Sequence, residues 1–270
     1  MVGAVVPSDT LASLTGEQAL WLLAMAGRAV LLARLASQGI VSTYKYFTGW
    51  LAVDSLRSVV LWVFAGDPST LAYAWVYVST VPVLGVLQVF VILELYTLVL
   101  RNHPGIARFG RRSIAGALAV ALLVATLTLF PDFSNPYQEH AFLLYAAIFE
   151  RAVCSALLLA LAAVTAFLVW FPVPLNRNTV VHSLVFAVFY LSGAILLLFR
   201  NLMGVEVIRI LSTANVAITT CCYFTWCILL TKGGERRSVV FGHRWRLEDE
   251  ERLMQQLNAV NETLLKSSRK

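Results

Sequence analysis

Charged residues are scarce in this sequence. Only 13% of its 270 residues are Asp, Glu, Lys or Arg, whereas 59% are hydrophobic, and the mean hydropathy is +0.75. A soluble domain usually has about 25% charged and about 45–50% apolar residues. A chain of this composition has too few polar side chains to cover its own surface in water. The composition therefore predicts an integral membrane protein, with the lipid bilayer as its surroundings.

Several patterns that carry chemistry are also absent. The four cysteines, Cys154, Cys221, Cys222 and Cys227, lie in apolar runs, and the four histidines are scattered, so we expect no disulfide framework, metal or haem site. The last apolar run has no lysine before Lys232, which excludes a retinal Schiff base. No hydrolase, zinc-protease or phosphate-loop motif indicates an enzyme or a cofactor. The net charge of +6 comes mainly from short loops, where basic residues orient a membrane chain, so no nucleic-acid partner is expected.

Seven apolar runs are each long enough to cross a bilayer as a helix, which takes about 20 residues. They cover residues 17–37, 45–65, 71–100, 113–130, 141–171, 180–199 and 206–231. Pro172 and Pro174 stop the fifth run, because proline cannot continue a helix. The sequence thus predicts an all-α membrane protein, with a seven-transmembrane-helix bundle over residues 1–232 and a tail over 233–270.

The charges of the connections predict the orientation of this bundle. The first, third and fifth connections and the tail are basic, with Lys45, Arg177 and Lys232 among their residues. The second and fourth connections have no basic residue, and the sixth has Arg200 balanced by Glu206. Because basic loops remain on the cytoplasmic side, we expect the N-terminus outside and the C-terminus in the cytoplasm.

Charged residues inside the spans form a candidate intramembrane polar site. A charge at the bilayer centre costs at least ~2.5–3.5 kcal/mol, yet six are present, namely Arg28, Asp54, Arg57, Glu94, Glu150 and Arg151. Their balanced signs favour pairing: Asp54 can reach Arg57 on its own helix, and Arg28 can reach Asp54 or Glu150 if their helices are neighbours. Three interpretations are open: ion pairs that fix helix packing, a polar or proton-linked site for a small ligand, or arginines that reach to an interface.

The seventh run carries a polar face. Its residues recur at spacings of three and four and lie on one side of a helix; they are Ser212, Asn215, Thr219, Cys222 and Trp226. A polar stripe faces other helices or water rather than lipid. The face predicts either helix packing or the lining of a ligand cavity.

The tail contains a further helix signal over residues 246–267. Leu253, Leu257, Val260 and Leu264 recur at spacings of four, three and four, which predicts a short amphipathic cytoplasmic helix with one apolar seam. The seam either lies on the cytoplasmic face of its own bundle or docks a second copy or a partner membrane protein. Residues 233–246 are predicted to be a linker.

Two short segments, residues 94–105 and His243-Arg244-Trp245-Arg246, resemble uncharacterised seven-helix membrane proteins of bacteria. The layout is also similar to the seven-helix sensor regions of some bacterial histidine kinases, without their long output domain. These resemblances imply a multi-pass protein of a bacterial cytoplasmic membrane. They imply a membrane sensor or partner-binding protein of unknown ligand.

A second resemblance implies a different function. Arg28-Ala29-Val30 in the first run is echoed by Arg151-Ala152-Val153 in the fifth, a placement similar to that in transporters with three helices, a linker helix and three more. The alternative is therefore a small-solute or proton-coupled transporter that uses the intramembrane charges.

Overall fold

The computed structural model describes residues 16–64, 71–100, 141–170, 174–202, 205–240 and 247–267, together with single positions between 106 and 119. These residues form seven long α-helices: α1 (Gly16–Ser37), α2 (Lys45–Phe64), α3 (Leu71–Val99), α5 (Ala141–Trp170), α6 (Arg177–Leu202), α7 (Val205–Leu229) and α8 (Leu247–Ser267). The expected all-α fold is confirmed, and each helix ends within a few residues of its predicted run. The predicted span 113–130 lies outside the residues described in full.

Among the residues that the structure describes, five helical segments are long and apolar enough to cross a membrane. They are Gln18–Ser37, Lys45–Phe64, Ala74–Val99, Arg177–Leu196 and Ile210–Leu229, and α5 holds a shorter apolar segment, Ala152–Ala166. Large apolar side chains are exposed on the outside of the bundle, such as Val63 at 71% and Ile228 at 68%. An apolar exterior suits lipid rather than water, which indicates a multi-pass membrane protein.

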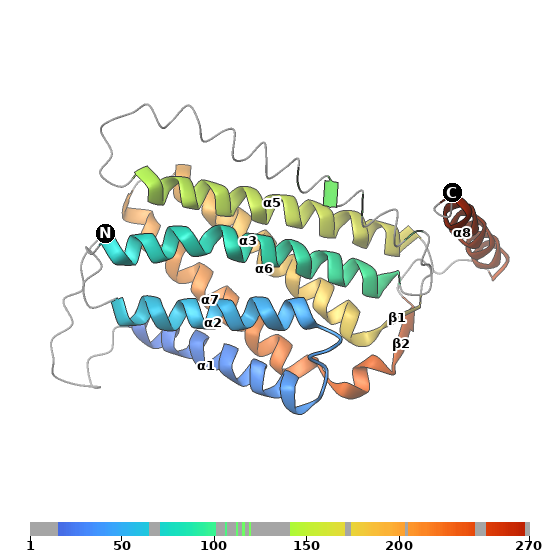
Figure 1. Ribbon diagram of the computed structural model, residues 1–270, viewed down its shortest axis with the longest axis horizontal. Helices are drawn as coiled ribbons and strands as arrows, with labels where there is room; N and C mark the ends of the chain where they lie inside the picture. The colour runs from blue at the N-terminus through green and yellow to red at the C-terminus, as the bar shows by residue number, and fades with distance from the viewer. Residues whose placement is uncertain are drawn as a thin grey trace.

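Within the described part of the chain, the helices other than α8 form a closed ring in the order α1, α2, α3, α5, α6, α7, with α7 packed against α1. In Figure 1, α1, α3, α5 and α7 run in one direction, and α2 and α6 run in the other. The connection between α1 and α2, the start of α6 and the end of α7 therefore share one end of the bundle. We call it the tail end, because α8 lies beyond it.

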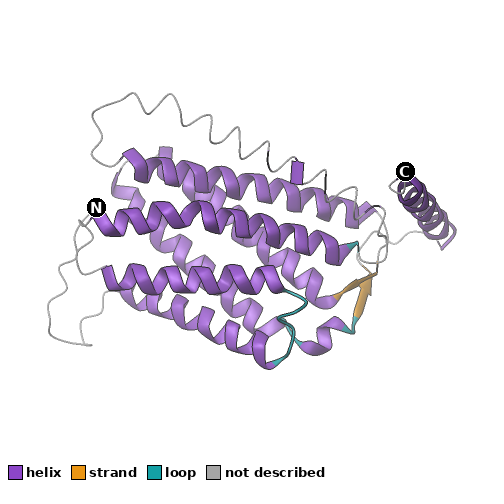
Figure 2. Cartoon of the chain, in the orientation of Figure 1, coloured by secondary structure: helices purple, strands orange, loops and turns teal. Residues whose placement is uncertain are grey.

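Residues 233–240 form a turn and a short strand at the tail end, which corrects the first part of the linker predicted over residues 233–246; residues 241–246 lie outside the described residues. After α7, the 3-10 turn η3 (Lys232–Glu235) leads into β2 (Ser238–Val240). This strand pairs antiparallel with β1 (Pro174–Asn176), so that Leu175 lies opposite Val239, as the orange strands in Figure 2 show. The pairing fastens the chain after α7 to the connection between α5 and α6. Segments of three residues are too short for an alternating pattern to reveal them.

α8 packs its apolar face against the tail end of the bundle. Leu257 is 3% exposed and belongs to a cluster that also holds Tyr96, Val99, Leu100, Val164 and Leu175, with Met254 beside it. The backbone N–H of Ile106 donates to the Asn261 side chain at 3.3 Å. The docking face is therefore centred on Met254, Leu257 and Asn261, which lie three and four residues apart.

Of the predicted tail seam, Leu257 is buried against the bundle, whereas Val260 is 52% exposed. Leu253 and Leu264 are half-buried. Leu253 and Met254 are apolar neighbours, so the spacing alone could not decide which of them faces the bundle.

Candidate functional site

Arg28 and Asp54 form an ion pair between α1 and α2. Arg28 Nη1 donates to Asp54 Oδ2 at 3.0 Å and to the Asp54 backbone oxygen at 3.1 Å. It also donates to the hydroxyl of Ser58. From α7, the Tyr223 hydroxyl donates to Asp54 Oδ2 at 3.1 Å, and its ring centre lies 5.2 Å from Arg28 Cζ. The expected Arg28–Asp54 pairing is therefore present, and these four residues, the Arg28–Asp54 lock, hold α1, α2 and α7 together.

Arg57 and Glu150 lie in a separate group. Arg57 Cζ is 4.7 Å from the ring centre of Tyr77 on α3, and the Tyr77 hydroxyl donates to Glu150 Oε2 on α5 at 3.1 Å. Asp54 is thus paired away from Arg57, contrary to the expectation of contact along α2. Residues three apart point about 60° apart around a helix, and here they face different neighbouring helices. The side chain of Arg151 lies outside the described residues.

Glu94 caps the start of α2. Both of its carboxylate oxygens accept from the backbone N–H of Tyr46 at 3.2 Å, and Oε2 also accepts from that of Phe47 at 3.2 Å. The first N–H groups of a helix have no partner within it, and a negative charge there is favourable. Glu94 on α3 therefore has a structural role, and the six predicted charges do not form a single site.

Replacing Glu94 with alanine is expected to lower the free energy of unfolding by about 0.5–2 kcal/mol, because the first turn of α2 loses its acceptors. Reversible unfolding in bicelles measures this change. Thr97→Ala is the matched control on α3, because the Thr97 hydroxyl bonds only to the Leu93 carbonyl of its own helix among the contacts described. Equal losses in the two variants would show that Glu94 is not a cap.

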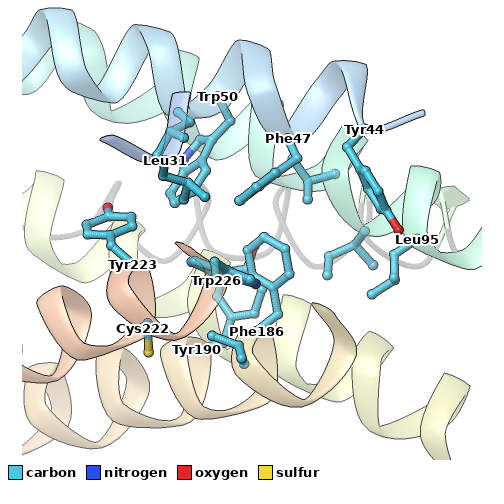
Figure 3. Packing of buried hydrophobic residues seen from close by; sticks show 14 of the residues in the cluster. Leu31, Tyr44, Phe47, Trp50, Leu95, Phe186, Tyr190, Cys222, Tyr223 and Trp226 are labelled. Carbon is cyan, nitrogen blue, oxygen red and sulfur yellow. The ribbon is translucent and has the colours of Figure 1, made fainter. Parts of the chain in front are cut away.

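Aromatic side chains fill the centre of the helix bundle. This aromatic cluster comprises Tyr44, Phe47, Trp50, His182, Phe186, Phe189, Tyr190, Tyr223 and Trp226. Tyr44 comes from the connection between α1 and α2, and the other rings come from the start of α2, from α6 and from α7. Figure 3 shows Phe47 and Trp50 opposite Phe186 and Trp226. His182 lies at its tail-end side, with ring centres 4.5 Å from Phe47 and 4.7 Å from Phe186. Edge-to-face and offset contacts of this kind stabilise aromatic clusters.

Several polar atoms in this cluster have no hydrogen-bond partner among the described residues. They are both ring nitrogens of His182, the indole nitrogens of Trp50 and Trp226, and the hydroxyl of Tyr190. All four side chains are at most 2% exposed. A buried polar group usually has a partner, and lacking one costs about 1–3 kcal/mol. The unpartnered groups of this cluster therefore call for an explanation beyond the packing of the rings.

A second polar group, the Glu235 latch, ties three connections together at the tail end. Glu235 Oε1 accepts from the Tyr44 hydroxyl at 2.6 Å and from Asn178 Nδ2 at 2.7 Å, and Oε2 accepts from Asn176 Nδ2 at 3.1 Å. Asn178 Nδ2 also donates to the Thr231 carbonyl at 2.7 Å. Burial, followed by the hydrogen bond to Glu235, raises the pKa of Tyr44, so its phenol stays protonated and donates. The latch is defined by these five residues.

Gly234 is required for the close approach within the latch. Its N–H donates to the Thr231 hydroxyl at 3.1 Å, which closes the first turn of η3. A Cβ at Gly234 would collide with the side-chain amide of Asn178, which is itself fully buried. Glycine is the residue that allows a backbone to come this close to a neighbour.

The latch is not among the sites predicted from the sequence. Apart from Tyr44, its residues lie in two polar segments, Asn176-Arg177-Asn178-Thr179 and Thr231-Lys232-Gly233-Gly234-Glu235, which flank predicted spans on the same side of the membrane. Clustered amides and a carboxylate at connections on one side were the available signal.

The predicted polar face of α7 turns inward over only part of its length. Cys222 and Trp226 are buried, Asn215 and Thr219 are half-buried, and Ser212 is exposed. Only the half of α7 nearer the tail end therefore contributes to the centre of the bundle.

No protein-family model matches the chain, and no curated protein or solved structure matches it either. Among the residues that the structure describes, no three His, Cys, Asp or Glu side chains gather to hold a metal ion. The described residues thus contain three groups in which a function can reside: the lock, the aromatic cluster and the latch.

Proposed function

We propose that this chain is a membrane sensor or partner-binding protein, in which a seven-helix bundle receives a signal and α8 passes it on. The observation that carries the proposal is the Glu235 latch. Its carboxylate belongs to the segment that leads to α8, and it accepts hydrogen bonds from the connection between α1 and α2 and from the start of α6. A change in the spacing of these connections would therefore alter the position of the tail.

The proposal includes seven spans, with the N-terminus outside and the C-terminus in the cytoplasm of a bacterium. The shared direction of α1, α3, α5 and α7 supports it. Lys45, Arg177 and Lys232 lie at or next to helix ends on the tail side. Basic residues at one end favour the cytoplasmic side for that end, which places α8 where a soluble or membrane-bound partner can reach it.

The alternative, a small-solute or proton-coupled transporter, has less support. Arg28 and Asp54 hold each other, and Glu94 is occupied by backbone N–H groups. These contacts occupy three of the charges on which such a carrier would rely. Flux into liposomes that Asp54→Asn or Glu150→Gln abolishes, in chains that remain folded, would favour the transporter.

A matched pair of substitutions on α8 tests the sensor proposal. Leu257→Asp places a charge in the docked face and is expected to release α8 from the bundle, because an unpaired charge is costly in an apolar contact. Val260→Asp changes a residue that is 52% exposed and is expected to leave α8 docked. Hydrogen–deuterium exchange over residues 247–267 measures docking, and cross-linking in native membranes measures complex formation.

We expect the complex with the partner protein to be lost in Val260→Asp and in a chain lacking residues 247–267, with the bundle still folded in both. An unchanged size and composition of the cross-linked complexes in both chains would show that the tail has no such role. Arg252→Ala is the control for a change at an exposed polar position of the same helix.

A further inference from the structure

We propose that the aromatic cluster binds a flat, largely apolar molecule with neutral hydrogen-bond acceptors, the chemistry of a quinone. The inference rests on the proposed sensor function only where it treats the bound molecule as the signal. It starts from the unpartnered atoms of His182, Trp50, Trp226 and Tyr190, which the helix packing does not explain.

The unpartnered groups define the polarity of the ligand. An indole N–H only donates, so Trp50 and Trp226 require acceptors, and the Tyr190 hydroxyl and one nitrogen of His182 can donate as well. None of the cluster residues is a cation, and Arg28, which touches the ring of Tyr223, is already paired with Asp54. An ionised ligand would be buried there without a counter-charge. Neutral carbonyl oxygens match these donors.

The surrounding rings define the shape of the ligand. The ring centre of His182 lies 5.1 Å from that of Tyr44 and 5.7 Å from that of Trp226. The ring of Phe186 stacks on that of Tyr190, with their planes 11° apart. A planar conjugated molecule can make the same stacked and edge-to-face contacts with these rings. The apolar exterior of the bundle suits a ligand that arrives through the bilayer.

Tyr44 connects this site to the tail. Its ring contacts His182, and its hydroxyl donates to Glu235 at 2.6 Å. Since the rings are in contact, a ligand that enters beside His182 has to displace one of them. Displacement of Tyr44 withdraws one of the donors that hold the Glu235 latch, so occupancy of the cluster is expected to loosen the tail.

Two matched probe molecules test whether the cluster binds a ligand with hydrogen-bond acceptors. The full chain in nanodiscs is titrated with 2,3-dimethyl-1,4-naphthoquinone and with 2,3-dimethylnaphthalene, which has the same flat skeleton without carbonyl groups. Each hydrogen bond gained contributes roughly a three- to tenfold gain in affinity. The quinone is therefore expected to bind saturably and at least about tenfold more tightly than the hydrocarbon. Equal affinities would overturn the assignment of acceptors, and the absence of saturable binding would overturn the site.

Two variants locate the binding. Tyr190→Phe and His182→Phe remove unpartnered groups, so each is expected to keep or raise the melting temperature of the unliganded chain and to weaken quinone binding roughly three- to tenfold. Tyr96→Phe is the matched control, because the Tyr96 hydroxyl has a partner, the Ile106 carbonyl at 3.3 Å, and its binding should be unchanged. Unaltered binding in both variants, or a lower melting temperature without any quinone binding, would assign the groups to internal waters only.

The test of quinone binding and the test of the sensor function can fail independently. Quinone binding is expected to persist in a chain that lacks residues 247–267, because the cluster lies within the bundle. Binding without any change in exchange at residues 232–240 would reject the link to the latch and leave the binding site intact. Loss of the tail's role in complexes would reject the sensor and leave the binding result unaffected.

Discussion

Asp54→Ala is expected to lower the free energy of unfolding by roughly 3–5 kcal/mol. The substitution leaves the guanidinium of Arg28, whose side chain is 8% exposed, without its counter-charge. It also removes the acceptor of the Tyr223 hydroxyl. Breaking a buried ion pair by removing one partner costs more than removing both, because the remaining charge is uncompensated. Reversible unfolding in bicelles, monitored by steric trapping, measures the loss of stability.

The double variant Arg28→Met with Asp54→Leu is expected to recover most of that stability, since neither charge remains. Leu56→Ala on the same helix is the control: Leu56 is 65% exposed, and its truncation should change the stability by about 0.5 kcal/mol or less. A double variant as unstable as Asp54→Ala would contradict a purely structural lock and revive the interpretation of a working charge pair.

Glu235→Ala is expected to free the tail while leaving the bundle folded. The hydroxyl of Tyr44 and the amides of Asn176 and Asn178 lose their shared acceptor. Hydrogen bonds to a charged group contribute about 1.5–3 kcal/mol each and are not additive. The opening free energy of residues 232–240 should therefore fall by roughly 2–4 kcal/mol in hydrogen–deuterium exchange, as a local rather than a global loss.

Arg236→Ala is the control for this experiment, because Arg236 follows η3 directly and its side chain is exposed. Its exchange pattern should resemble that of the unaltered chain. Glu235→Gln keeps one acceptor oxygen and should fall between the two. A uniform increase in exchange through α1 and α7 in Glu235→Ala would mean that the latch stabilises the whole bundle rather than the tail.

The boundaries of the helices were predictable because apolar runs and prolines report them directly. α1 and α2 begin and end within a residue or so of the predicted spans. The pairing of Arg28 with Asp54 was also within reach, because the pair needed only the adjacency of α1 and α2. These features depend on local composition or on neighbours in the chain.

Other features depend on which helices meet, and local patterns in the sequence do not reveal those contacts. Glu94 is satisfied by backbone N–H groups rather than by one of the arginines, and a list of side-chain charges cannot indicate such a partner. Arg57 faces Tyr77 because α3, rather than α1, lies on that side of α2. The unpartnered nitrogens of the aromatic cluster become visible only when the surrounding rings are in place.

The latch also has a consequence for the synthesis of the protein. Tyr44 and Glu235 are 191 residues apart, and β1 meets β2 only after α7 has been made. Because a chain emerges from the ribosome N-terminal end first, the α1–α2 hairpin has to wait in the membrane with its Tyr44 hydroxyl unengaged until the last span has been inserted. Closure of the latch thus marks the completion of the bundle. A nascent chain that stalls before Glu235 lacks the acceptor that joins the connections at the tail end.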